Sequence, residues 1–354
     1  MSDRAHLEFA LALHDVIAAD RHANACWSPY SVASALGLGA LAAAGETRAE
    51  LVRLLGEGNA DLLKAAVPDS DAEFAVANTL WAWDELEINP AFVEGLARWA
   101  GGNVRSAPFG TDPEGARKLI NSDVAETTKD LIPELLKSGA VRSDTVATIV
   151  NALYLKTAWL GEFPADATSP QPFHTPGGTT QVPTMRREAK MRYAAQHGWQ
   201  AVSLPAHGGV EALVLLPDAD LTKIDSGLLT ALVDALEFRS IELLLPKSDV
   251  QVAVQLKDAL TGLGVRKLFD ADGDLTGLSP DPRVFVDEVL HEAVLRIDEE
   301  GLEGAAATSM LMRMTSFEPY VEPLTVRVDR PYILLVRHVH TGAVYFLAQV
   351  VDPS

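Results

Sequence analysis

Few residues in this chain of 354 have types and spacings that could support metal or catalytic chemistry. His338 and His340 are two residues apart in a predicted strand, so their imidazoles would share one face and could bind a metal ion. No third ligand can be identified beside them, which favours two ordinary sheet histidines. The acidic stretch 270–274 resembles part of a calcium loop but lacks the glutamate that should follow it, which favours a solvated turn. We expect no metal and no cofactor.

The motifs of common hydrolases and nucleotide-binding enzymes are missing from the sequence. There is no Gly-x-Ser-x-Gly elbow, no His-Glu-x-x-His and no phosphate loop ending in Gly-Lys-Ser/Thr. The single cysteine, Cys26, cannot form an internal disulfide, and a small core residue is favoured over a catalytic thiol. The sequence therefore predicts that the protein is not an enzyme.

The most unusual stretch is 299–316, with the sequence Glu-Glu-Gly-Leu-Glu-Gly-Ala-Ala-Ala-Thr-Ser-Met-Leu-Met-Arg-Met-Thr-Ser. Its alanines favour an exposed helix or linker. Gly301 and Gly304 oppose a helix start, because each glycine costs about 0.5–1 kcal/mol there. The alternative is a mobile strand, in which Gly304, Ala306 and Thr308 share one face and are small enough to slide between two existing strands. The glycines would then serve as a hinge.

The composition limits the partners. The formal net charge is 29 − 49 = −20, which argues against nucleic acid, an anionic membrane surface or a heparin-like polyanion. Residues 1–20 have no apolar core of the signal-peptide kind. The most apolar stretch, 32–44, is shorter than the about 20 residues that a membrane-spanning helix needs. The chain as written is expected in the cytoplasm, or outside the cell if a leader was removed.

Hydrophobic periodicity predicts helices mainly in the first third of the chain and strands in the rest, which favours an α+β fold. No linker or internal repeat is visible, so we expect a single domain over 1–354. The predicted helices cover 5–19, 31–44, 48–55, 90–99, 112–128 and 256–262. The predicted strands cover 75–81, 145–156, 179–187, 191–195, 199–204, 211–216, 240–245, 250–255, 284–290, 293–297, 324–328, 332–338 and 343–350.

Several segments, in order along almost the whole chain, resemble the serpin family of protease inhibitors. The strongest is 299–308, Glu-Glu-Gly-x-Glu-Gly-Ala-Ala-Ala-Thr, which is similar to the hinge of the serpin reactive-centre loop. On these segments the chain is identified as a member of the family, in a prokaryotic-type inhibitory form without an obvious signal peptide. The other segments are Ser28-Pro29-Tyr30-Ser31-Val32, Gly45-Glu46-Thr47-Arg48, residues 151–159, Val182-Pro183-Thr184-Met185, residues 213–217, Arg330-Pro331-Tyr332 and residues 341–353.

The resemblance implies a fold and a mechanism. The fold would have three β-sheets, about eight or nine helices and an exposed reactive-centre loop over about 299–322, with a strained five-stranded sheet. A serine protease would cleave the loop and become trapped as an acyl-enzyme while the loop inserts as an extra strand. The partner would be the protease in a covalent 1:1 complex, and the inhibitor would be a monomer. The alternative is a non-inhibitory serpin that acts as a substrate, carrier or chaperone.

The resemblance also implies where the loop is cut and where it bends. Counting 17 residues from Glu299 places the scissile bond between Thr315 and Ser316, and the small Thr315 suits an elastase-like pocket. Met314 is the alternative and suits a chymotrypsin-like pocket. Leu302 replaces the usual threonine or serine, and its side chain should turn inward and could slow insertion. The hinge residues would be Glu299, Gly301, Leu302, Gly304, Ala305, Ala306, Ala307 and Thr308.

Two further groups of residues match serpin motifs. Ser28, Ser31, Asn151 and His291 align with the shutter, a polar cluster beneath the sheet that opens. Trp159 and Lys247 align with the breach, where insertion begins, and Lys247 could form an ion pair with Glu299.

Overall fold

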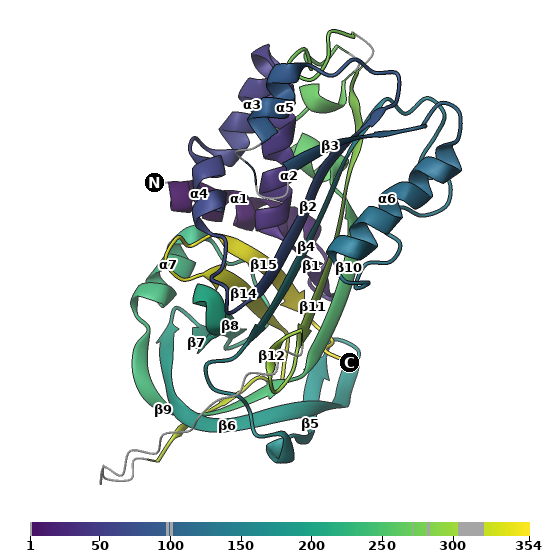
Figure 1. Cartoon of the computed structure of the whole chain (residues 1–354). Coiled ribbons are helices and arrows are strands. Elements are labelled where there is room, and N and C mark those ends of the chain that lie inside the picture. The colour runs from purple at the N-terminus through teal and green to yellow at the C-terminus, as the bar shows by residue number, and fades with distance from the viewer. Residues whose placement is uncertain (1, 97–98, 100–101, 271, 282–283, 304–321) are drawn as a thin grey trace.

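Helices predominate in the first 130 residues and strands predominate over helices in the rest, as the periodicity predicts (Figure 1). The computed structural model describes residues 2–96, 99, 102–270, 272–281, 284–303 and 322–354. Within these residues there are eight α-helices, in agreement with the expected number. They are α1 (Ser2–Ile17), α2 (Pro29–Ala42), α3 (Gly45–Leu55), α4 (Asn59–Ala65), α5 (Pro90–Leu96), α6 (Pro113–Thr127), α7 (Ser226–Asp234) and α8 (Lys257–Gly262).

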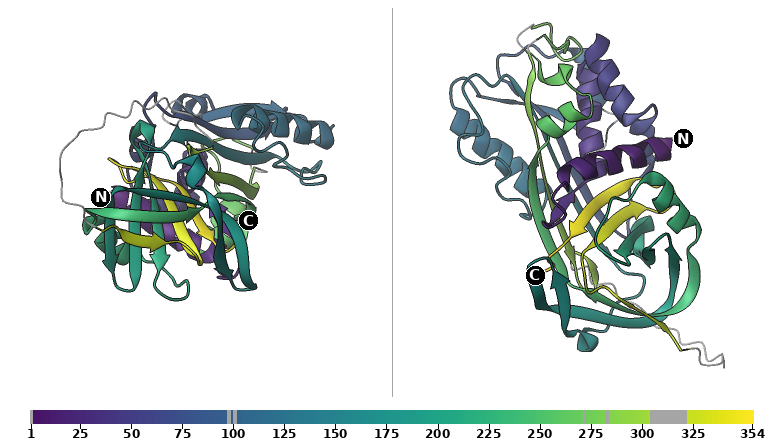
Figure 2. Two further views of the ribbon diagram at one scale, coloured as in Figure 1. Left: turned by 90° about the horizontal axis from the view of Figure 1, so that it is seen from below. Right: turned by 180° about the vertical axis from the view of Figure 1, so that it is seen from behind.

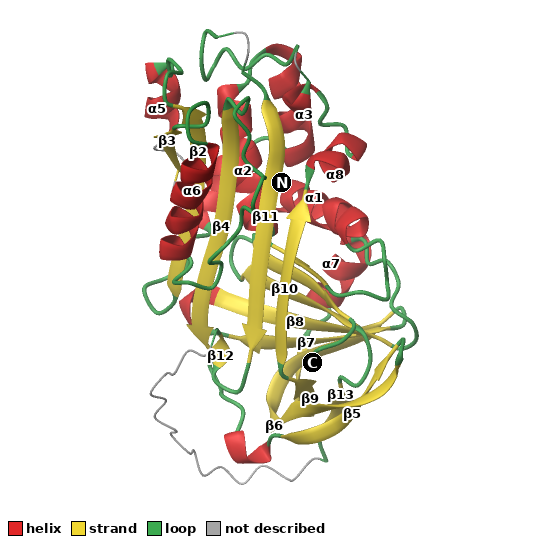
Figure 3. Cartoon of the chain, turned by 90° about the vertical axis from the view of Figure 1, so that its right-hand side faces the viewer, coloured by secondary structure: helices red, strands yellow, loops and turns green. Residues whose placement is uncertain are grey.

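The first sheet is the one that positions the loop hinge. It has six strands in the order β10-β11-β12-β4-β2-β3, and β11 also pairs directly with β4 (Figure 3). The two long strands at its centre are parallel to each other, and β12 is a two-residue strand. The strands are β2 (Glu73–Trp83), β3 (Gly102–Ala107), β4 (Ala147–Ala158), β10 (Ser248–Gln255), β11 (Val286–Ile297) and β12 (Gly301–Leu302).

The second sheet has nine strands, in the order β1-β15-β14-β8-β7-β6-β9-β13 with β5 paired to β6. The expected count of three sheets is corrected to two among the described residues. The reason is β6, which runs for 19 residues where two short strands were predicted, and which pairs with β5, β7 and β9. The strands are β1 (Ala25–Trp27), β5 (Ser169–Thr175), β6 (Gly178–Gln196), β7 (Trp199–Pro205), β8 (Val210–Pro217), β9 (Glu237–Pro246), β13 (Leu324–Arg327), β14 (Tyr332–His338) and β15 (Val344–Val350).

Helix α2 lies between the two sheets and contacts β2, β4 and β15. Twelve of its fourteen residues are buried, which explains why it is rich in Ala, Gly and Ser and has no polar face. Its N-terminus is capped by Ser28, whose side chain accepts a hydrogen bond from Ser31 N, and Pro29 occupies the first turn. The serine-rich start of α2 therefore faces the six-stranded sheet from within the core.

The six-stranded sheet is covered on both faces. Along β4, Ile149 and Leu153 belong to the main core on the α2 side, whereas Val150 and Ala152 belong to a second core on the α6 side. Figure 1 shows α6 on the face opposite α1 and α2. Seen from behind, α1 lies alongside β15, which it contacts (Figure 2). Of the described helices, none combines the length and the apolar character needed to cross a membrane.

Candidate functional site

The start of the predicted loop is a strand of the six-stranded sheet. Leu302 pairs with Ile297 of β11 on one side and with Thr157 of β4 on the other, and Gly301 pairs with Ala158. Figure 3 shows β12 at the ends of β4 and β11. The expected number of five strands in this sheet is thereby corrected to six, because Gly301 and Leu302 of the hinge form β12.

Leu302 explains why the hinge is in the sheet. Its side chain is 1% exposed and belongs to the main hydrophobic core, so it turns inward as expected for this position. Burial of a leucine side chain stabilises by about 1.5–3 kcal/mol relative to exposure. Burial of this apolar residue, which departs from the family pattern, therefore stabilises the inserted position of β12, whereas its effect on the rate of insertion stays a prediction.

The turn that brings β12 back against β11 is fixed by Asp298 and Gly301. Asp298 Oδ1 accepts hydrogen bonds from Glu300 N at 2.9 Å and Gly301 N at 3.1 Å. A Cβ atom at Gly301 would lie 2.1 Å from Thr157 O, so a side chain does not fit without displacing the strand. Glu303 follows with a left-handed backbone (φ 60°), and its carboxylate pairs with Arg296 at 3.1 Å. A non-glycine residue with this backbone stores strain at the point where the strand ends.

Two groups outside the loop hold Glu299. Lys247 Nζ lies 2.7 Å from Glu299 Oε2, which is the ion pair expected from the sequence, and Thr168 Oγ1 donates to Oε1 at 2.7 Å. Burial alone would raise the pKa of Glu299, but the hydrogen bonds from Lys247 and Thr168 outweigh it and hold the pKa below its usual value. Glu299 is therefore a charged anchor for the hinge.

Trp159 holds the backbone of the same turn. Its indole Nε1 donates to Asp298 O at 3.0 Å, and its amide donates to Glu300 O at 2.9 Å. Four residues later, Phe163 N donates to Glu299 O at 2.9 Å. The segment 159–163, which we call the strap, therefore binds the backbone of three consecutive residues before β12.

The four residues assigned to the shutter belong to one buried hydrogen-bond network, which also includes Asn78 and Ser34. His291 Nε2 accepts from Ser28 N at 2.9 Å, and Ser28 Oγ accepts from Ser31 N at 3.1 Å. Ser31 Oγ donates to Asn151 Oδ1, and Asn151 Nδ2 donates to Asn78 Oδ1. The network joins α2 to three neighbouring strands, because Asn151 lies on β4, Asn78 on β2 and His291 on β11.

Asn78 and Ser34 are the members that sequence reasoning missed. Asn78 Nδ2 donates to Ser34 Oγ at 2.6 Å, and Ser34 lies one helical turn after Ser31 on α2. The signal in the sequence was an asparagine in the largely apolar stretch 74–83, and in the structure Asn78 is fully buried. Its importance depends on the register that places Asn78 opposite Asn151, which only the structure reveals.

His291 is neutral in this network. Burial lowers its pKa to about 3, and Nε2 can accept from Ser28 N only while it is unprotonated. A charged imidazole would lose this hydrogen bond and would be buried away from solvent. The network is therefore intact only with the neutral ring.

Part of the predicted site lies outside the described residues. This applies to the hinge residues Gly304, Ala305, Ala306, Ala307 and Thr308, and to the candidate scissile residues Met314, Thr315 and Ser316. The next described element is β13, which pairs in parallel with β9. The structure thus brings together Glu299, Gly301, Leu302, Trp159 and Lys247 in one cluster, and Ser28, Ser31, Asn151 and His291 in another.

Comparisons with known proteins assign the family. The serpin (serine protease inhibitor) family profile matches residues 4–353. The leukocyte elastase inhibitor of Bos taurus is 31% identical, covering 92% of both chains, and Iripin-2 of Ixodes ricinus is 30% identical, covering 98% of this chain and 92% of its own. The chain belongs to the serpin family.

Solved structures share the fold. Uncleaved ovalbumin superposes with a TM-score of 0.87 at 24% identity, covering 99% of this chain and all of its own. Human thyroxine-binding globulin complexed with thyroxine has a TM-score of 0.89 at 23% identity, covering 100% of this chain and 98% of its own. At this identity the two structures establish the α+β serpin fold alone.

Proposed function

We propose that this protein is a suicide inhibitor of serine proteases with chymotrypsin-like or elastase-like specificity. The protease serine attacks the carbonyl carbon of Thr315, the Thr315–Ser316 peptide bond breaks, and the amine of Ser316 leaves with a proton. An ester then joins the protease serine to Thr315. The freed loop inserts between β4 and β11 and carries the protease with it before water can hydrolyse the ester.

The observation that carries this proposal is the position of β12. Gly301 and Leu302 already pair with β4 and β11 in the chain with its loop uncut, so further residues of the loop can extend the same strand. Each new backbone hydrogen bond contributes about 0.5–1.5 kcal/mol net. The small residues at 304–308 suit this process, because they present little volume to the two existing strands. The proposal includes a single domain over 1–354, a reactive-centre loop over about 299–322 and a monomeric protein.

The test is to mix the protein with chymotrypsin and with pancreatic elastase and to separate the products on a denaturing gel. We expect a covalent band near the sum of the two masses. Sequencing the released C-terminal peptide distinguishes cleavage after Thr315 from cleavage after Met314. Cleavage without an adduct, with both enzymes, would contradict the inhibitory function.

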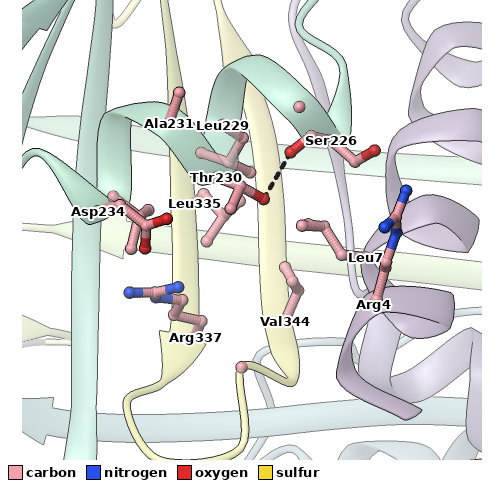
Figure 4. A pocket seen from close by; sticks show the side chains of 13 residues that line it. Arg4, Leu7, Ser226, Leu229, Thr230, Ala231, Asp234, Leu335, Arg337 and Val344 are labelled. Atoms are coloured by element: carbon pink, nitrogen blue, oxygen red, sulfur yellow. Dashed lines mark hydrogen bonds between the residues drawn. The ribbon is translucent and has the colours of Figure 1, made fainter. Parts of the chain in front are cut away.

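A carrier function is the second candidate, and one cavity favours it. A cavity of about 570 Å³ lies between α1, α7, β14 and β15 (Figure 4). Its walls are apolar around Leu229, Leu335 and Val344, and Arg337 and Asp234 lie at one end. A volume of this size suits a small amphipathic molecule. Saturable binding of thyroxine that is abolished by Leu335→Trp, in a protein that gives no adduct, would favour the carrier.

A further inference from the structure

Glu303, which follows β12, already lies opposite Arg296 of β11. Leu302 pairs with Ile297, so the next pair in this antiparallel ladder is Glu303 with Arg296. The backbone agrees, because Glu303 N donates to Arg296 O at 3.1 Å, and the two side chains form an ion pair at 3.1 Å. Glu303 is therefore the first charged residue that a longer β12 would bring into the sheet.

The charged pair lies on the α6 face of the sheet. On β11, Val294 belongs to the core on the α6 side, whereas Ile297 belongs to the main core. Side chains alternate along a strand, so Arg296 shares the face of Val294. Leu302 belongs to the main core, and Glu303 follows it, so an extended strand would direct Glu303 to the same α6 face.

On the other side of β12, β4 supplies a lysine at the same level. Leu302 pairs with Thr157 in antiparallel register, so extension of the strand would place Glu303 opposite Lys156. Ala152 of β4 belongs to the core on the α6 side, and Lys156, four residues later, shares its face. The inserted Glu303 would therefore lie between two cations, one on each neighbouring strand.

Carboxylates continue this line of charges on the outer strands. Asp249 of β10 is the register partner of Arg296, and its Oδ2 accepts a hydrogen bond from Arg296 Nε at 3.0 Å. Glu73 of β2 is the register partner of Lys156 and also pairs with Lys129. With the loop inserted, the charges would alternate across five strands. We call this line the charge row, and its members are Asp249, Arg296, Glu303, Lys156 and Glu73.

We propose that the charge row fixes the register in which the loop enters the sheet, with Arg296 and Lys156 as the positioning residues for Glu303. Opposite charges on directly opposed residues of neighbouring strands stabilise their pairing. A shift of one residue would turn Glu303 toward the main core. A shift of two would place Glu303 opposite Val294 or Asp298 and would leave an uncharged residue between the two cations. The inference rests on the proposed function, because it presupposes that the loop inserts.

A charge-reversal cycle between positions 303 and 156 tests this register. The four proteins are the wild type, Glu303→Lys, Lys156→Glu and the double variant. Each is cleaved with thermolysin, which cuts before large apolar residues such as those at 310–312, and mass spectrometry verifies the cut. A zinc protease forms no acyl-enzyme through a serine, so the inhibitor does not trap it and cleavage goes to completion. The measurement is the change in the thermal unfolding midpoint that cleavage produces.

We expect cleavage to raise the wild-type midpoint, and each single variant to lose part of this rise, because residue 303 then lies beside a like charge. The double variant should recover, so that its rise exceeds the sum of the single effects by about 2–8 °C. Where Lys156→Glu does not fold, Lys156→Gln replaces it and should give about half of this coupling. Glu300→Lys, at the exposed neighbouring glutamate, is the matched control, and its effect should add to that of the variant at position 156 within about 1 °C.

The possible outcomes separate this inference from the proposed function. Simple addition of the two effects, in a protein whose midpoint rises on cleavage, would overturn the charge row and leave inhibition standing. A rise with the expected coupling, in a protein that forms no adduct with chymotrypsin or elastase, would support the charge row and contradict inhibition. A wild-type midpoint that does not rise would overturn loop insertion and the charge row together.

Discussion

His291 on β11 lies opposite Asn151 on β4, and the parallel ladder between these two strands ends at this pair. Farther along, the same strands pair with β12 instead, through Ile297 and Thr157. The two residues also belong to one hydrogen-bond network anchored on α2. In the proposed mechanism, β4 and β11 separate from this point to admit more of the loop, and the buried hydrogen-bond network holds the two strands together there.

Removing the central amide of this network should destabilise the protein. Asn151→Ala leaves Ser31 Oγ and Asn78 Oδ1 without their present partner in a buried site. An unpaired buried polar group costs about 1–3 kcal/mol, so we expect the free energy of unfolding in urea to fall by at least that amount. Asn24→Ala serves for comparison, because it removes the side-chain amide of an asparagine that lies outside the network. A change below about 0.5 kcal/mol in Asn151→Ala would mean that the network contributes nothing to stability.

Acid should destabilise the protein through its buried histidines. Burial lowers the pKa of His291 to about 3, and burial is also the largest cause that lowers the pKa of His6 and His14 to about 4. The unfolded chain binds these protons near pH 6.5, so stability is fully present above about pH 6.5 and is lost as the pH falls toward the folded-state values.

The histidine contribution can be isolated with His291→Gln. Each such histidine contributes a slope of up to about 1.4 kcal/mol per pH unit between these limits, and glutamine cannot titrate. We therefore expect the free energy of unfolding in urea to fall less steeply between pH 6 and pH 4 in the variant than in the wild type, by about the slope of one histidine. His22→Gln, at an exposed histidine, is the control and should keep the wild-type slope. Parallel curves for wild type and His291→Gln would rule out His291 as a source of acid sensitivity.

The anchor at Glu299 should restrain the hinge modestly. Glu299→Gln removes the charge that pairs with Lys247, whose side chain is 39% exposed, so the pair is worth about 0–1 kcal/mol. We expect amide exchange at residues 301–303 to become a few times faster. Glu300→Gln, at the exposed neighbouring glutamate, should have no effect. Because the pKa of Glu299 is lowered, the pair is present above the usual glutamate pKa, and its contribution is lost as the pH falls through the folded-state value.

A charge at position 302 should prevent insertion. Leu302→Glu would place a carboxylate among the core residues that surround Leu302, and an unpaired buried charge is strongly unfavourable. We expect β12 to leave the sheet, with loss of amide protection at residues 301–303, and the protease to cleave the loop without forming an adduct. Leu302→Thr, which is uncharged and matches the family pattern, should retain the adduct. An undiminished yield of adduct in Leu302→Glu would show that this residue need not enter the sheet.

Many of the elements could be predicted from the sequence, although α4, α7, β1, β3 and β5 were not, and the registers of the strands could not be predicted at all. Short apolar runs rich in strand-forming residues predicted the positions of β4, β8, β14 and β15, which are buried along nearly their whole length, and motif resemblance selected Ser28, Asn151 and His291. Two predicted strands on either side of residues 188–190 are one strand, because β6 continues through polar residues on its exposed face. Local patterns cannot distinguish such a strand from two strands and a turn.

The state of the hinge could not be predicted for a different reason. Leu302 was expected to turn inward, but whether the sheet had already admitted it depends on the space between β4 and β11, which is a tertiary property. The same holds for Asn78 and for the strap, since a buried asparagine and a backbone amide at Trp159 carry no signal of their partners. Residues far apart in sequence create the hinge site, and their contacts follow from registers that no local pattern encodes.

The central claim is that the six-stranded sheet accepts the cleaved loop as a full strand, and thermal unfolding after loop cleavage tests it most directly. The inserted loop would form about ten new backbone hydrogen bonds, each of which contributes about 1 kcal/mol. Because each kcal/mol raises the unfolding midpoint by about 2 °C, we expect the midpoint to rise by about 20 °C or more. The cleaved peptide must remain associated after purification. A cleaved protein that unfolds at or below the midpoint of the intact chain would contradict insertion and the inhibitory mechanism that depends on it.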